Sequence, residues 1–68
     1  MSSFTNIADP LVEIHHLQFR ERSVTKKWEL AFDKLGQFPN VVLVRQVAEL
    51  AAERDSLSRA IAELSAEL

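Results

Sequence analysis

The sequence predicts an all-α protein in which two helices fold back on each other as an antiparallel hairpin. In both halves of the chain, apolar residues recur alternately three and four positions apart. The single glycine and one of the two prolines lie together between these halves. At 68 residues the chain can form only one small domain. We therefore expect a single helical-hairpin domain over residues 9–68, preceded by a flexible N-terminal segment, residues 1–8.

The first helix is predicted over about residues 10–35. Asp9 can accept hydrogen bonds from the first free amides, and Pro10 lacks a donor that would be unpaired at the first helical position. Gly36 suits the left-handed position that ends many helices, and Lys34 complements the negative end of the helix dipole. The residues expected to face the second helix are Ile14, Leu17, Glu21, Val24, Trp28, Ala31 and Leu35.

The second helix is predicted over about residues 41–68, with Asn40 as its N-cap. The β-branched run at residues 41–44 could begin a strand, but no second strand exists to pair with it and the heptad pattern continues through it. The residues expected to face the first helix are Leu43, Val47, Leu50, Arg54, Leu57, Ile61, Leu64 and Leu68.

Helices of matched length joined by the short loop at residues 36–40 should pack into an antiparallel hairpin. We call the line of contact between them the seam. Residues facing each other across it should have numbers that sum to about 78, which places Trp28 opposite Leu50. The two polar residues of the seam, Glu21 and Arg54, then fall in adjacent layers, where they either form an ion pair or both extend to solvent.

One hairpin has a single seam, and so short a chain rarely buries enough apolar surface alone. One flank of the seam is charged, whereas the other carries only small, apolar or uncharged residues. This uncharged flank consists of Gln18, Thr25, Phe32, Val44, Ala51, Ser58 and Ser65. We expect it to form a dimer interface that completes a twofold-symmetric four-helix bundle. The alternative is a monomer that covers the flank with Phe4 and Ile7. The predicted interface residues are Thr25, Phe32, Val44, Ala51 and Ser58.

No pattern in the sequence is typical of an enzyme. There is no cysteine, and the two histidines, His15 and His16, are adjacent instead of four residues apart as in a helical metal site. Glycine-rich phosphate loops and nucleophile elbows are also absent from the sequence. We therefore expect no catalytic residues, no metal and no cofactor.

The longest aliphatic run, residues 41–44, is far shorter than a membrane span, and the N-terminal sequence does not resemble a signal peptide. We expect a cytoplasmic protein that makes no membrane contact. The net charge of −2 argues against a general nucleic-acid coat but permits a local basic patch.

A stripe on the outer face of the first helix is the candidate binding site for another protein. Phe19 and Arg22 should point away from the seam, and both residue types are common in interface hot spots. The alternative is that Phe19 packs against a dimer partner in some other geometry. The predicted partner-binding residues are Val12, His15, Phe19, Arg22 and Lys26.

The function that follows is that of a small non-enzymatic regulator or adaptor, of the inhibitor or antagonist type, acting as a homodimer on another protein. One alternative is a nucleic-acid-binding dimer that uses a basic face formed by Arg20, Arg22, Lys26 and Lys27. A second alternative is a structural coiled-coil assembly module.

Overall fold

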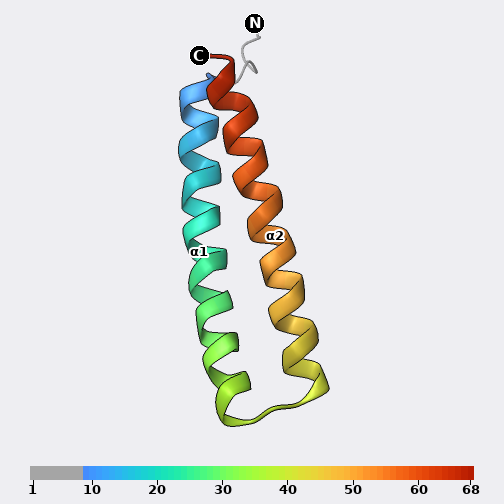
Figure 1. The fold of residues 1–68 in the computed structure, drawn as a ribbon. Helices are drawn as coiled ribbons and strands as arrows, with labels where there is room; N and C mark the ends of the chain where they lie inside the picture. Colours follow the sequence, from blue (N-terminus) through green and yellow to red (C-terminus); the bar gives the residue numbers. More distant parts are fainter. Residues whose placement is uncertain (1–8) are drawn as a thin grey trace, which may run out of the picture.

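The computed structural model describes residues 9–68 and contains two helices, α1 (Pro10–Gln37) and α2 (Val41–Ala66). They lie side by side in opposite directions and pack against each other (Figure 1). The predicted all-α helical hairpin is therefore confirmed. The predicted flexible segment, residues 1–8, lies outside the described residues, and so do Phe4 and Ile7. In the described part of the chain, neither helix is long and apolar enough to cross a membrane.

Both helices begin at the residues predicted from their caps. The Asp9 carboxylate accepts a hydrogen bond from the Leu11 amide at 3.0 Å, and Pro10 occupies the first turn of α1. The Asn40 side chain accepts a hydrogen bond from the Leu43 amide at 2.9 Å and donates one to the Phe38 carbonyl at 3.0 Å. Asn40 thus begins α2 and also ties it to the loop.

The end of α1 differs from the prediction. The helix continues through Gly36 to Gln37, and no glycine among the described residues has a positive φ, so a left-handed cap at Gly36 is wrong. The cap is Phe38, whose amide donates to the Lys34 carbonyl at 2.7 Å. Because a residue that precedes proline is disfavoured in the α conformation, Pro39 ends the helix at Phe38. At the other terminus, α2 ends at Ala66, two residues before the predicted end.

The core lies along the predicted seam. The four buried side chains are those of Ile14, Val24, Ala31 and Leu57, all of them seam residues. The remaining seam residues are half-buried, except Arg54 and Leu68, which are exposed. The molecule measures 53 × 24 × 14 Å, so its thinnest dimension is close to the diameter of one helix. The hairpin is therefore one layer thick, and its seam is covered by no second layer among residues 9–68.

The two polar residues of the seam have separate partners. The Glu21 carboxylate accepts a hydrogen bond from the Ser58 hydroxyl. The Arg54 guanidinium lies 5.8 Å from the centre of the Trp28 ring, a distance typical of a cation–π contact. The expected Glu21–Arg54 ion pair is thus absent from the described residues, and neither side chain simply extends to solvent. The hydrogen bond to Ser58 agrees with the predicted register, which placed Glu21 opposite the neighbouring Leu57.

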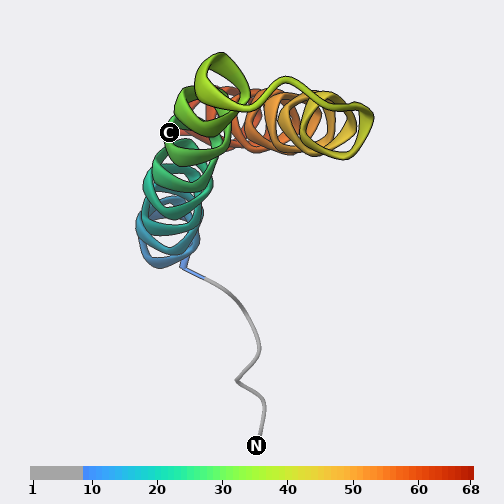
Figure 2. The same cartoon turned by 90° about the horizontal axis from the view of Figure 1, so that it is seen from below.

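The two helices overlap in Figure 1 where α1 begins and α2 ends, but the view turned by 90° separates these two ends (Figure 2). The helices therefore cross at an angle as they run past each other. The residues of the connection are not helical: Asn40 is extended, with φ −157° and ψ 163°, and Phe38 has φ −135° and ψ 74°.

Candidate partner-binding surface

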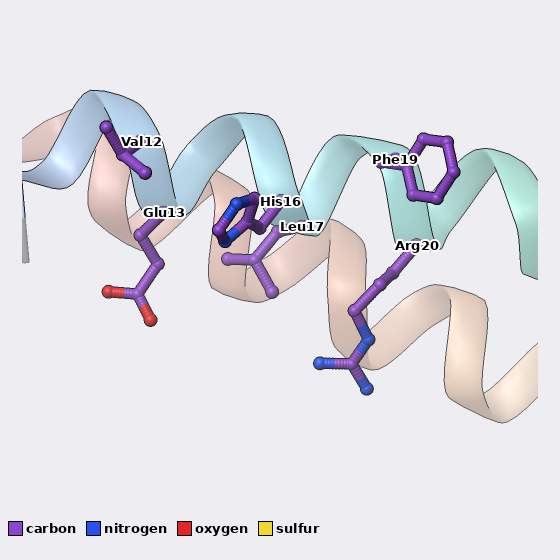
Figure 3. Close-up of a pocket in the computed structure, with 6 residues that line it drawn as sticks. All are labelled: Val12, Glu13, His16, Leu17, Phe19 and Arg20. Carbon is purple, nitrogen blue, oxygen red and sulfur yellow. The ribbon is translucent and has the colours of Figure 1, made fainter.

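The structure places the predicted partner-binding residues on one exposed face of α1. Val12, His15, Phe19, Arg22 and Lys26 are all exposed, and spacings of three and four residues align them along the helix. In Figure 3, Val12 and Phe19 project from the side of α1 that faces away from α2. Phe19 is 71% exposed, the highest value for any large apolar side chain of α1. The prediction that Phe19 points outward is compatible with this geometry, whereas its binding role stays a prediction.

Phe19 stands between two open hollows. The larger, of about 540 Å³, extends toward the beginning of α1 (Figure 3). Its lining residues are Val12, Glu13, His16, Leu17, Phe19 and Arg20. The smaller hollow, of about 330 Å³, lies on the other side and is lined by Phe19, Arg22, Ser23 and Lys26. A ring with space on both sides can be enclosed by a partner, so this geometry suits an anchor residue.

Four residues that line the larger hollow were not among the predicted partner-binding residues: Glu13, His16, Leu17 and Arg20. Conversely, His15 was predicted to be part of the site but lines neither hollow. The spacing of Val12, His16 and Phe19, four residues and then three, carries the signal that was missed. It marks a second row of neighbours on the same helix face, one step away from the predicted stripe.

The charge around Phe19 is mostly positive. Arg20, Arg22, Lys26 and Lys27 are all exposed. Within residues 9–68 the one ion pair is Arg59–Asp55, at 2.7 Å, in the C-terminal half of α2. There the hydrogen bond from Arg59 to Asp55, together with the charge of that carboxylate, raises the pKa of Arg59 above its ordinary value. None of the four cations near Phe19 has such a partner in the described part of the chain, so all are available to pair with acidic groups of another molecule.

The predicted dimer-interface residues lie on a different side of the hairpin. Phe32 and Val44 are each 55% exposed, Ala51 and Ser58 are exposed, and Thr25 is half-buried. The Phe32 ring stacks on Trp28, with ring centres 5.0 Å apart and planes inclined by 26°. This stack extends the apolar surface of the seam outward onto the uncharged flank.

The uncharged flank is bordered by charges that were not expected there. A hollow of about 240 Å³ opens at its middle, lined by Trp28, Ala51, Arg54, Asp55 and Ser58. Arg54 reaches this side because it lies over the Trp28 ring. The flank residues themselves carry no charge, but Arg54 and Asp55 stand at its edge. Any partner that covers the flank must therefore accommodate one cation and one anion near its centre.

In the region that the structure describes, no group of three or more His, Cys, Asp or Glu side chains could hold a metal ion. His15 and His16 are both exposed. The chemistry that the surface offers is that of contact: one aromatic anchor, neighbouring apolar side chains and surrounding cations.

Comparison of the chain with protein-family models, with curated proteins and with solved structures finds no match. The class of protein that the fold defines is a two-helix hairpin, and its function is argued below from its surfaces.

Proposed function

We propose that this chain is a non-enzymatic regulator or adaptor that acts as a helical-hairpin homodimer and binds another protein through the outer face of α1. The observation that carries the proposal is the exposure of Phe19 between two hollows. Phe19 lines one hollow together with Val12 and Leu17, and an exposed apolar patch is typical of a protein-binding surface.

The chemistry of the surface describes the partner. It should offer an apolar pocket for the Phe19 ring and carboxylates within reach of Arg22 and Lys26. Such an arrangement would combine an aromatic anchor at the centre with charge pairs at the rim, which is the usual anatomy of an interface. A chain whose described residues offer contact surfaces would act by covering a site on its partner, as an inhibitor or antagonist does.

Dimerisation is supported by the thinness of the hairpin and by Phe32 and Val44, which remain half exposed in a single chain. The expected measurement is a molecular mass of two chains by light scattering at micromolar concentration. The companion change Ala51→Glu should dissociate the dimer or unfold the chain, because it places a charge on the flank. A mass of one chain for the unaltered protein would contradict this part of the proposal.

The binding surface is tested by Phe19→Ala combined with Arg22→Ala. A matched control is Leu30→Ala combined with Lys34→Ala, which also removes an exposed apolar side chain and a cation from α1. Both double variants should keep helical circular dichroism and the mass of the unaltered protein. In affinity capture with tagged chains, the unaltered chain and the control variant should retain the same bound protein, and only the first double variant should fail to bind it. Unfolding of the first variant would show that Phe19 belongs to a core, and normal capture would place the interface elsewhere.

The nucleic-acid alternative rests on one observation: Arg20, Arg22, Lys26 and Lys27 are exposed and without an ion pair among the described residues. Salt dependence separates the two functions. Neutralising phosphates with four cations per chain would make affinity fall steeply as salt rises. Binding anchored on Phe19 should fall much less steeply with salt, because only the charge pairs at its rim are screened.

A further inference from the structure

The loop end of the hairpin carries a group of apolar side chains that the partner-binding surface does not use. These side chains, which we call the loop-end group, are Phe32, Phe38, Val41 and Val44, and all are exposed. No charged residue occurs between Gly36 and Val44. The nearby seam residues Leu35 and Leu43 are half-buried. Exposed apolar side chains are thus concentrated at the loop end, beside seam residues that are themselves partly exposed.

We propose that a second copy of this chain docks on the uncharged flank with its loop at the same end, so that the two loop-end groups pack against each other. The inference rests on the homodimer proposed above and adds the relative orientation of the two hairpins, together with two contact residues, Phe38 and Val41.

The distribution of side chains along the flank favours this orientation. Phe32 and Val44 lie at its loop end, whereas Gln18, Ser58 and Ser65 lie toward the other end. With both loops at one end, α1 of each copy lies beside α2 of the other. Phe32 then meets Val44 of the second copy, and Gln18 meets Ser58, so apolar surface covers apolar surface and polar groups meet polar groups.

In the opposite orientation, the loop of each hairpin lies beside the end of the second copy where α1 begins and α2 ends. Phe32 and Val44 would then cover polar residues such as Gln18 and Ser58, and Phe38 and Val41 would lie beyond the contact. Burying apolar surface against apolar surface is the main favourable contribution to association, so this arrangement gains less.

The available area is adequate for a dimer. The four exposed side chains of the loop-end group offer roughly 450 Å² per chain, or about 900 Å² for two copies. The smaller residues of the flank, which run along the whole hairpin, extend the contact into the range of about 1,200–2,000 Å² found for stable interfaces. Alanine and serine at positions 51, 58 and 65 let the helices approach closely enough for this contact.

The orientation has a consequence for binding. In this orientation the two copies are related by a rotation of half a turn about an axis parallel to the helices. The outer faces of their two α1 helices therefore point in opposite directions. The two Phe19 surfaces would therefore lie at the same height on opposite sides of the dimer. Each dimer would bind two separate partner molecules, and one small partner could not span both sites.

The experiment uses the absence of cysteine from the chain, which allows one spin label to be attached at a single introduced cysteine. Gln37→Cys labels the loop end, and Ser65→Cys labels the other end. Both residues are exposed, and neither side chain caps a helix. Distances between labels in the dimer are then measured by pulsed electron resonance, after circular dichroism and light scattering of each labelled protein.

With the loops together, identical labels on the two chains should lie within about 25 Å of each other, because neighbouring helices in a bundle are about 10 Å apart. Mixed dimers with Gln37→Cys in one chain and Ser65→Cys in the other should give distances of about 40 Å, because the two positions are about 24 helical residues apart at about 1.5 Å each. The reverse pattern, long distances between identical labels and short ones in mixed dimers, would overturn the orientation and leave the proposed dimer standing. A labelled protein with the mass of one chain would overturn both.

A second test compares two neighbouring valines that are each 73% exposed. Val41 lies three residues before Val44 and shares its face, whereas Val42 lies on the face of Gln46. Val41→Asp and Val42→Asp place the same charge in the first turn of α2, where the helix dipole favours both. Val41→Asp should weaken dimerisation by tenfold or more, and Val42→Asp by less than twofold. Equal effects of the two changes would overturn the role of the loop-end group.

Discussion

The two ends of the hairpin follow the same heptad pattern, and each end combines buried with half-buried positions. Away from the loop, Ile14 and Leu57 are buried, whereas Ile61 is half-buried. Near the loop, Ala31 is buried, whereas Leu43 is half-buried. A regular apolar pattern therefore specifies which residues face each other, but it does not determine how far each of them is buried.

The largest test of this comparison is the truncation of one leucine at each end. Leu57→Ala removes a buried side chain and should lower the free energy of unfolding by about 3 kcal/mol, a large part of the stability of so small a protein. Leu43→Ala, at a half-buried position, should cost about 1 kcal/mol in a single chain. Urea denaturation followed by circular dichroism at one protein concentration measures both. Equal losses would show that the two leucines are buried alike in solution.

Loss of the N-cap of α2, Asn40, should have a smaller effect on stability. Asn40→Ala removes the acceptor of the Leu43 amide and the donor to the Phe38 carbonyl, and should cost about 1 kcal/mol. Asn40→Asp is a useful control, because it keeps the acceptor for the helix and loses only the donor. It should retain most of the stability in the same urea experiment. If Asn40→Ala proved neutral, the cap would not hold the loop end in place.

Gly36→Ala should raise stability by about 0.5–1 kcal/mol, because alanine is the better helix former and lowers the entropy of the unfolded chain. Gly36 lies inside α1, its φ is not positive, and a Cβ atom would meet no neighbour within 4 Å. The readout is a higher denaturation midpoint. A destabilised variant would instead support the left-handed cap that the sequence predicted.

The smallest effect is expected at the Arg59–Asp55 pair in α2. Both side chains are largely exposed, and solvent screens an ion pair between residues four apart on a helix surface. Arg59→Gln should leave the thermal midpoint unchanged within error at physiological salt. A clear loss of stability would mean that this half of α2 is covered in solution by another surface.

The seam could be predicted from the sequence because it depends only on the period of apolar residues. The caps at Asp9 and Asn40 could also be predicted from the sequence, because each side chain bonds an amide only two or three residues away. The end of α1 was mispredicted because glycine and proline give competing signals three residues apart, and Pro39 determines where the helix stops. Such competition between two local preferences is decided by the loop as a whole.

The details of the candidate site were less predictable. The outward direction of Phe19 follows from the helical period, but the hollows beside it depend on the paths of long side chains such as Arg20 and Lys26. The position of Arg54 over Trp28 likewise required the relative placement of the two helices. Charge pairing across the seam looked plausible from residue numbers alone, yet a serine and an aromatic ring proved to be the partners.

Because α1 begins and α2 ends at the same end of the hairpin, a pulling force applied between them would act across the seam (Figure 1). Such a force opens the layers one after another, as in a zipper, whereas a pull along the helices would load all the layers together. The first layer to open contains the buried Ile14, the next contains the half-buried Leu17 and Ile61, and buried residues follow again at Leu57 and Ala31. Mechanical resistance should therefore rise and fall from one layer to the next as the hairpin opens.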